Sequence, residues 1–80
     1  MNIYKISQTG NDDYDTYDSA IVAAESTTIA KFIHPAGDVS WDGKEGLYSS
    51  WCNVSEVEVE FIGQTKISNR CVILASFNAG

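Results

Sequence analysis

Apolar and acidic residues alternate most regularly in residues 54–63. The apolar members are Val57, Val59 and Phe61, and the acidic ones are Glu56, Glu58 and Glu60. A period of two places the two sets on opposite faces of a β-strand. The segment therefore predicts a strand with one face buried and one face acidic.

Three further segments predict strands. Residues 2–8 contain Ile3, Tyr4 and Ile6, and residues 19–24 read Ser-Ala-Ile-Val-Ala-Ala. Residues 71–77 are apolar at almost every position, which is typical of a central strand. Between the first two strands, residues 9–18 are rich in Gly, Asn and Asp and predict a loop. The first two strands would then form a hairpin with an acidic tip.

One short helix is expected between these strand pairs. Ser26 is a good N-cap, and residues 27–34 place Ile29, Ala30, Phe32 and Ile33 at helical spacing. The step from His34 to Pro35 ends the helix, because proline disfavours the α conformation in the residue before it. A helix of about two turns is stable only when it docks on other structure.

The order of elements predicts an α+β domain. We expect a single domain, residues 1–80, with an antiparallel four-stranded sheet and one short helix packed on one face, in the order ββαββ. Residues 36–53 predict either a helical turn near 44–51 or an irregular loop anchored by Trp41 and Trp51. This segment would either shield the second sheet face or leave it as an apolar surface for a dimer or another partner.

The charge balance narrows the class of partner. Eleven carboxylates face five basic residues, a net charge of −6. Such a chain repels nucleic acid and anionic membranes and is attracted to basic protein surfaces. The alternative, which charge alone favours, is that the acidity only keeps a small protein soluble. The start of the chain lacks the basic residues and the long apolar stretch of a signal peptide, and a cytosolic protein is expected.

Two acidic groups are candidate partner-binding sites. The first is the predicted loop, in which Tyr14 and Tyr17 stand among four aspartates. A calcium loop counted from Asp13 would need Gly at its sixth position and Glu at its twelfth, and this chain has Asp and Ala there. Tyrosines are enriched at binding hot spots, but here they could equally pack on the sheet rim. The aspartates are Asp12, Asp13, Asp15 and Asp18.

The second group is the row of Glu56, Glu58 and Glu60. On one face of a strand, these carboxylates would stand about 7 Å apart. They form either a solvated face, with Lys5 and Lys66 as balancing cations, or a stripe that meets Arg and Lys of a partner.

Catalytic and cofactor signatures are weak in this sequence. His34 is the only histidine, and its place at a helix end suits an interaction with the carbonyls of the last turn. A Cys52, His34 and Asp arrangement stays open, although no local motif supports it. Cys52 and Cys71 are expected to be reduced thiols, without a CxxC motif for a metal. We expect no enzyme, no metal and no cofactor.

Several strings of this chain resemble small phage and prophage proteins. They are residues 14–20 (Tyr-Asp-Thr-Tyr-Asp-Ser-Ala), 23–26 (Ala-Ala-Glu-Ser), 33–35 (Ile-His-Pro) and 73–80 (Ile-Leu-Ala-Ser-Phe-Asn-Ala-Gly). Some small acidic proteins of this kind resemble anti-CRISPR inhibitors of type I effector complexes, and type I-C is the first type that we would expect. The resemblance implies a non-enzymatic monomer in the host cytoplasm that covers a basic DNA-binding surface. The alternative is a phage structural or accessory interaction domain, which could be homodimeric.

Overall fold

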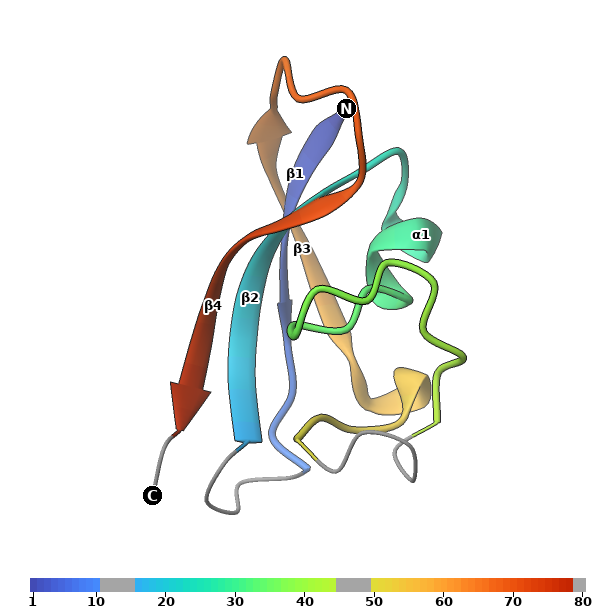
Figure 1. Ribbon diagram of the computed structural model, residues 1–80, viewed down its shortest axis with the longest axis vertical. Coiled ribbons are helices and arrows are strands. Elements are labelled where there is room, and N and C mark those ends of the chain that lie inside the picture. Colours follow the sequence, from blue (N-terminus) through green and yellow to red (C-terminus); the bar gives the residue numbers. More distant parts are fainter. Residues whose placement is uncertain (11–15, 45–49, 79–80) are drawn as a thin grey trace.

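A four-stranded antiparallel sheet with one short helix forms the protein (Figure 1). The computed structural model describes residues 1–10, 16–44 and 50–78. The strands β1 (Asn2–Ser7), β2 (Thr16–Ala24), β3 (Glu58–Gln64) and β4 (Cys71–Asn78) lie in the order β3-β1-β2-β4. Between β2 and β3 come the helix α1 (Thr27–Lys31) and a 3-10 turn, η2 (Val54–Glu56). The predicted α+β class and the ββαββ order are confirmed.

The helix begins as predicted and ends early. The Ser26 hydroxyl accepts a hydrogen bond from the Ile29 N–H at 3.3 Å, as an N-cap does. At the other end, the Phe32 and Ile33 N–H groups donate to carbonyls three residues back, and the His34 N–H donates to the Asp38 carbonyl. The chain therefore leaves the helix before Pro35, with Phe32 as the C-cap.

Two strand starts differ from the prediction. β2 starts at Thr16, within the predicted loop, because the Tyr17 N–H donates to the Ser50 carbonyl and Tyr17 pairs with Phe77. Asp18 is accommodated as the extra residue of a bulge. β3 starts at Glu58, so the prediction of a strand from residue 54 is wrong for the turn η2.

The position of β4 also differs from the prediction. Its continuous apolar character predicted a central strand, but β4 pairs only with β2 and forms one edge of the described sheet. Leu74 is 68% exposed, and Ile73 and Phe77 are nearly half exposed. A run of apolar residues indicates side chains that are more stable away from water, but it does not show that the strand has neighbours on both sides. In β4, several of these side chains remain exposed.

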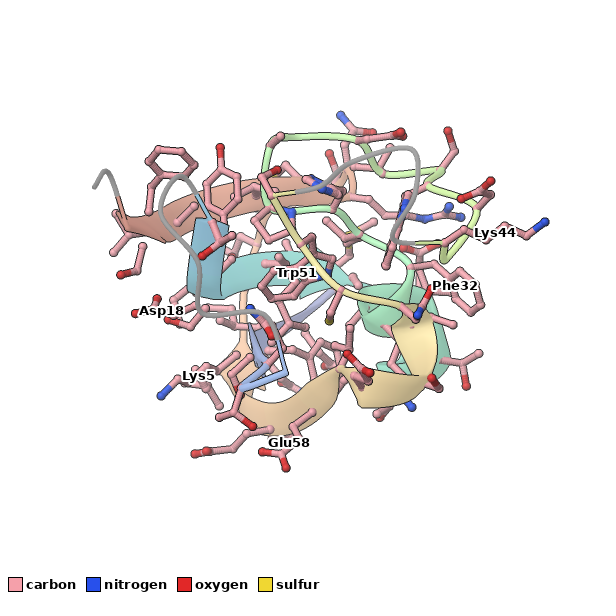
Figure 2. All side chains as sticks on the ribbon, turned by 90° about the horizontal axis from the view of Figure 1, so that it is seen from below. Lys5, Asp18, Phe32, Lys44, Trp51 and Glu58 are labelled. Atoms are coloured by element: carbon pink, nitrogen blue, oxygen red, sulfur yellow. The ribbon has the colours of Figure 1, made fainter. Side chains whose placement is uncertain are left out.

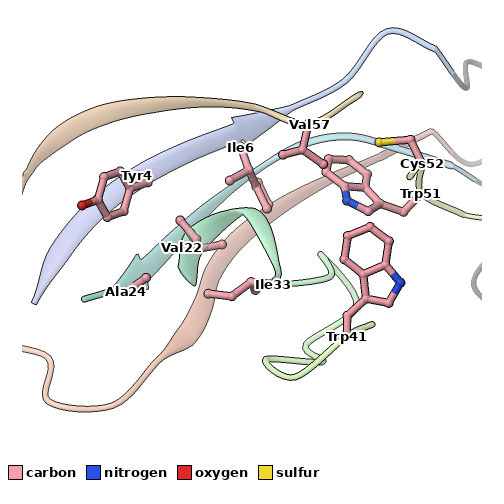
Figure 3. Packing of buried hydrophobic residues seen from close by; sticks show 11 residues of the cluster. Tyr4, Ile6, Val22, Ala24, Ile33, Trp41, Trp51, Cys52 and Val57 are labelled. Atoms are coloured by element: carbon pink, nitrogen blue, oxygen red, sulfur yellow. The ribbon is translucent and has the colours of Figure 1, made fainter. Parts of the chain in front are cut away.

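The core lies on one face of the sheet (Figure 3). Side chains alternate along a strand, so Tyr4 and Ile6 of β1 share this face with Ala20, Val22 and Ala24 of β2, with which they pair or neighbour. The helix end and the segment around the tryptophans pack on them. The covering residues are Ala30, Ile33, Trp41, Trp51, Cys52 and Val57.

The outer face of the sheet is left without a covering layer among the described residues. Trp41 and Trp51 are buried in the core and cover the same face of the sheet as the helix, so they do not shield the outer face. A helical turn near 44–51 falls mostly outside the described residues. Ile3 and Ile21 on the outer face are half-buried, and Leu74 beside Ile21 is exposed.

No described helix is long and apolar enough to cross a membrane. Cys52 is buried and Cys71 is half-buried, and neither forms a disulfide.

Candidate functional site

Four exposed carboxylates lie at and beside one end of the sheet. β1 ends there, and β2 and β3 begin there, since β1 is antiparallel to both neighbours. We call the four exposed carboxylates at and beside this end the acidic patch. Its members are Asp18, Glu56, Glu58 and Glu60.

Glu58 and Glu60 lie on the outer face of β3. Glu58 pairs with Ser7 and Glu60 with Lys5, and these β1 residues alternate with the buried Tyr4 and Ile6. The expected division of the strand into an apolar and an acidic face is therefore confirmed from residue 58 onward. Phe61 shares the core face with Tyr4, which its ring meets edge-on at 5.8 Å, but as an edge residue it stays 58% exposed.

Glu56 does not belong to this row. It lies in η2, and its carboxylate reaches the start of the loop that follows β1. A Cβ placed on Gly10 would stand 2.7 Å from Oε2 of Glu56. Gly10 is the last described residue before segment 11–15, so Glu56 brings its charge to the point where that acidic segment begins. Sequence periodicity gave no signal for this contact, because a 3-10 turn interrupts the period.

Asp18 lies on the same side of the molecule. It precedes Ser19, which pairs with Ser7, and Ser7 in turn pairs with Glu58. The Ser19 hydroxyl lies 3.2 Å from Oδ1 of Asp18 and can donate to it. Figure 2 looks onto this end and shows Asp18, Lys5 and Glu58 together on one side, away from Phe32 and Lys44. The other predicted acidic residues of this group, Asp12, Asp13 and Asp15, lie outside the described residues, as does Tyr14.

Only one cation accompanies the acidic patch in the described structure. Lys5 stands across from Glu60, where opposite charges attract weakly, but no ion pair within 4.0 Å joins a patch carboxylate to a described residue. Lys66, the other predicted balancing cation, follows β3 at its far end. Between residues of the described ranges, the one salt bridge joins Arg70 to Glu25, also away from the patch. The patch thus presents carboxylates whose charge is largely uncompensated.

Tyr17 has a packing role. Its ring meets Phe77 at 4.7 Å and the His34 ring at 6.1 Å, both edge-on. The side chain is half-buried beside the core. Of the two interpretations open for this residue, rim packing accounts for its ring contacts.

His34 is a core residue in an aromatic surrounding. Its side chain is fully buried, with Trp41 at 5.7 Å and Trp51 at 6.4 Å between ring centroids. Nδ1 accepts a hydrogen bond from the Ala36 N–H at 3.0 Å, which requires the neutral ring. Burial lowers the pKa of His34, and the Asp38 charge partly opposes this. The recorded contacts differ from the predicted interaction with the last helical turn.

Within residues 1–10, 16–44 and 50–78, no three His, Cys, Asp or Glu side chains converge as ligands. Cys52 and His34 are both fully buried in the core, where a substrate would not reach them without rearrangement.

No protein-family model, curated protein or solved structure matches this chain.

Proposed function

We propose that this protein is a binding protein whose acidic patch docks on a basic, nucleic-acid-binding surface of a protein partner. The observation that carries the proposal is the clustering of Asp18, Glu56, Glu58 and Glu60, all exposed, with Lys5 as their one described cationic neighbour. Arg and Lys side chains that hold phosphates also bind carboxylates, so such a patch competes for the same groups.

The partner class to test first is a type I CRISPR effector complex. The motive is the resemblance to small anti-CRISPR proteins, together with the charge of −6. In this proposal the protein covers the DNA-binding surface and prevents target DNA from binding, with no chemical step. The test is a target-DNA binding assay on purified type I-C and other type I effectors at saturating concentrations of this protein. Unchanged DNA binding with every effector would contradict the proposed partner, whatever the role of the patch.

The role of the patch is tested by variants with equal net charge. Glu58→Gln with Glu60→Gln removes two charges from the patch. Gln64→Lys with Asn69→Lys changes the net charge equally at exposed positions near the other end of the sheet. We expect the patch variant to bind the partner more weakly and the control to bind nearly as the wild type does. Equal weakening by both pairs would show that only the net charge matters.

A second candidate function is supported by the other edge of the sheet. The exposed apolar residues Ile73, Leu74 and Phe77 favour a structural or accessory role through protein contacts at β4. Salt separates the two functions, because binding through the patch weakens as ionic strength rises and apolar contact does not.

A further inference from the structure

The two edges of the described sheet differ sharply in charge. β3 carries Glu58 and Glu60, whereas β4 contains no Asp, Glu, Lys or Arg from Cys71 to Asn78. Edge strands are usually protected by charges, proline, bulges or a covering element, because their free N–H and C=O groups invite another strand. On β4 the one such device is the bulge at Ile73, where the register to β2 shifts. Residues 74–78 follow it as an uncharged edge.

The same edge is continuous with the uncovered outer face. Leu74 lies beside Ile21 in the pairing of β4 with β2, and Ile21 pairs with Lys5 on the next strand. Leu74 is 68% exposed, the largest exposed fraction among the large apolar side chains of the described residues. A strand added at β4 would form hydrogen bonds with the free N–H and C=O groups of this edge. It would also bring apolar side chains beside Leu74.

We propose that the β4 edge pairs with β4 of a second copy of this chain, antiparallel and about a two-fold axis. An isologous contact of this kind places each strand against an identical one. Residues 74–78 of both copies are neutral, so a two-fold contact sets no like charges opposite each other in the added ladder. Two chains of net charge −6 can approach most readily at such a neutral edge.

The sheet order favours the second copy further. β3 and β4 are separated by three strand spacings, and two sheets joined through β4 place their β3 strands seven spacings apart, about 34 Å at 4.8 Å per spacing. The Debye length at physiological ionic strength is about 8 Å. Pairing through β4 therefore keeps Glu58 and Glu60 of the two copies beyond each other's influence. Pairing through β3 would bring them together.

The β4 pairing does not rest on the proposed function of the acidic patch, and it gives the second candidate function, contact at β4, a specific partner. The dimer edge and the Glu58 and Glu60 row lie on opposite strands of the sheet, so each can fail without the other. Salt distinguishes them as well, since association through β4 should be unchanged or strengthened by added salt.

The test is sedimentation equilibrium on the full chain over a range of concentrations. The wild type should show an average mass that rises toward two chains. Leu74→Lys should remain at one chain, while Ile62→Lys, an equal charge change on a half-exposed isoleucine of β3, should behave as the wild type does. Both variants lower the net negative charge by the same amount. Loss of association in Leu74→Lys alone therefore shows that the contact lies at the β4 edge.

Three outcomes would overturn the proposal. A one-chain mass for the wild type up to about 1 mM, where even weak complexes are populated, leaves the edge to a strand of another protein. A two-chain mass that persists in folded Leu74→Lys places the contact elsewhere. Amide hydrogen exchange of the wild type gives a test that needs no variant. Protection that rises with concentration must appear in residues 74–78, and a rise confined to β3 contradicts the proposal.

Discussion

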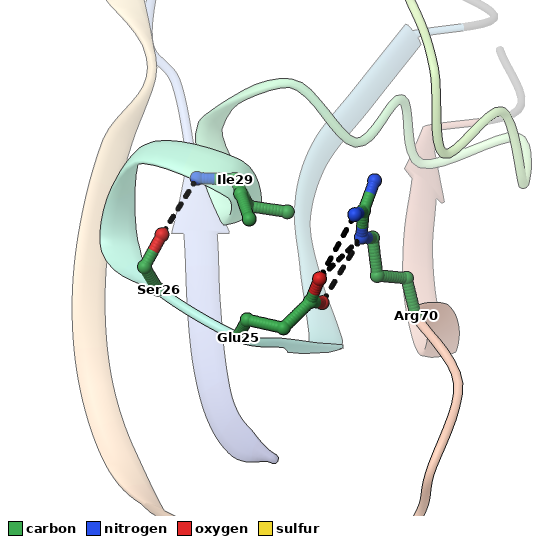
Figure 4. A network of polar contacts seen from close by, with 4 residues as sticks. All are labelled: Glu25, Ser26, Ile29 and Arg70. Atoms are coloured by element: carbon green, nitrogen blue, oxygen red, sulfur yellow. Dashed lines mark hydrogen bonds and ion pairs between the residues drawn. The ribbon is translucent and has the colours of Figure 1, made fainter.

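The Arg70 guanidinium binds the Glu25 carboxylate through two of its nitrogens, and the two residues are 45 positions apart in the sequence. Nε lies 3.0 and 2.9 Å from the two carboxylate oxygens, and a terminal nitrogen lies 2.8 Å from Oε2 (Figure 4). Glu25 directly follows β2, and Arg70 directly precedes β4. The pair therefore ties the end of one strand to the start of its neighbour, beside the Ser26 cap of the helix.

The Arg70 contact predicts a small, salt-sensitive effect on stability. Arg70→Ala should lower the Tm by no more than a few degrees, because both side chains are partly exposed and water screens them. Arg70→Lys should recover only part, since an ammonium group lacks the planar fork. Differential scanning calorimetry at low and high salt measures the effect. Lys66→Ala, which removes an exposed cation without this partner, serves as control, and an equal fall in that variant would contradict the assignment.

His34 predicts a loss of stability as the pH falls. The pKa of the folded state is lowered by burial, so the unfolded chain takes up a proton first, near pH 6.5. The stabilisation is complete above that pH and declines between it and the lower folded pKa, by at most about 1.4 kcal/mol per pH unit for one proton. Urea unfolding at pH 7.5, 6.5 and 5.5 measures the decline.

Two further measurements isolate His34 from the carboxylates. His34→Gln should flatten the decline above pH 5.5. In the wild type, NMR titration of the ring should place its pKa below that of a free histidine, with Asp38 as the nearby charge that limits the shift. A ring that titrates at or above 6.5 in the folded protein would refute this prediction.

Gly43 predicts a backbone-specific cost. Its φ is +84°, and a Cβ there would lie 3.0 Å from a Val54 methyl and 3.1 Å from the Phe32 ring. The Gly43 carbonyl also accepts the Val54 N–H at 2.9 Å, which fixes the approach. Gly43→Ala should cost more than the 1–2 kcal/mol, roughly, of left-handed strain alone. Gly37→Ala is the matched control, because its φ is +109° but its surroundings are open. Equal costs in chemical denaturation would exclude the steric contribution.

Trp51 predicts the largest single loss. It is fully buried at the centre of the core. Trp51→Ala should cost about 3–5 kcal/mol, a large fraction of the stability of so small a domain. Ile62→Ala, at a half-exposed position, should stay within about 0.5 kcal/mol. Circular dichroism and urea titration provide the readout, and a Trp51→Ala protein as stable as the Ile62→Ala control would contradict the placement of the core.

Local structure was predicted from the sequence more accurately than the order of the strands in the sheet. The alternation around Val59, the Ser26 cap and the Pro35 stop depend on nearby residues alone, and the structure confirms the strand, the cap and a helix that ends before the proline. The edge position of β4 could not be predicted, because periodicity reports which residues avoid water and not which strand lies beside them. The start of β2 at Thr16 was missed, because Asp18 favours a turn in the sequence but lies in a β-bulge within the strand.

The candidate site was predicted in part. Glu58, Glu60 and their neighbour Lys5 follow from strand alternation and register. The approach of Glu56 to Gly10 depends on tertiary placement of a 3-10 turn, for which no spacing rule exists.

The strand order has a kinetic consequence. The hairpin of β1 and β2 forms the middle of the sheet, and both later strands add to its flanks, with Asn2 paired to Gln64 and Thr16 to Asn78. Contact order is therefore high for a chain of this length, which slows folding. During synthesis the hairpin emerges first, and its β1 flank stays open until β3 follows and its β2 flank until β4 follows. A nascent chain without β4 therefore exposes the edge of β2, and an unpaired strand edge of this kind promotes aggregation.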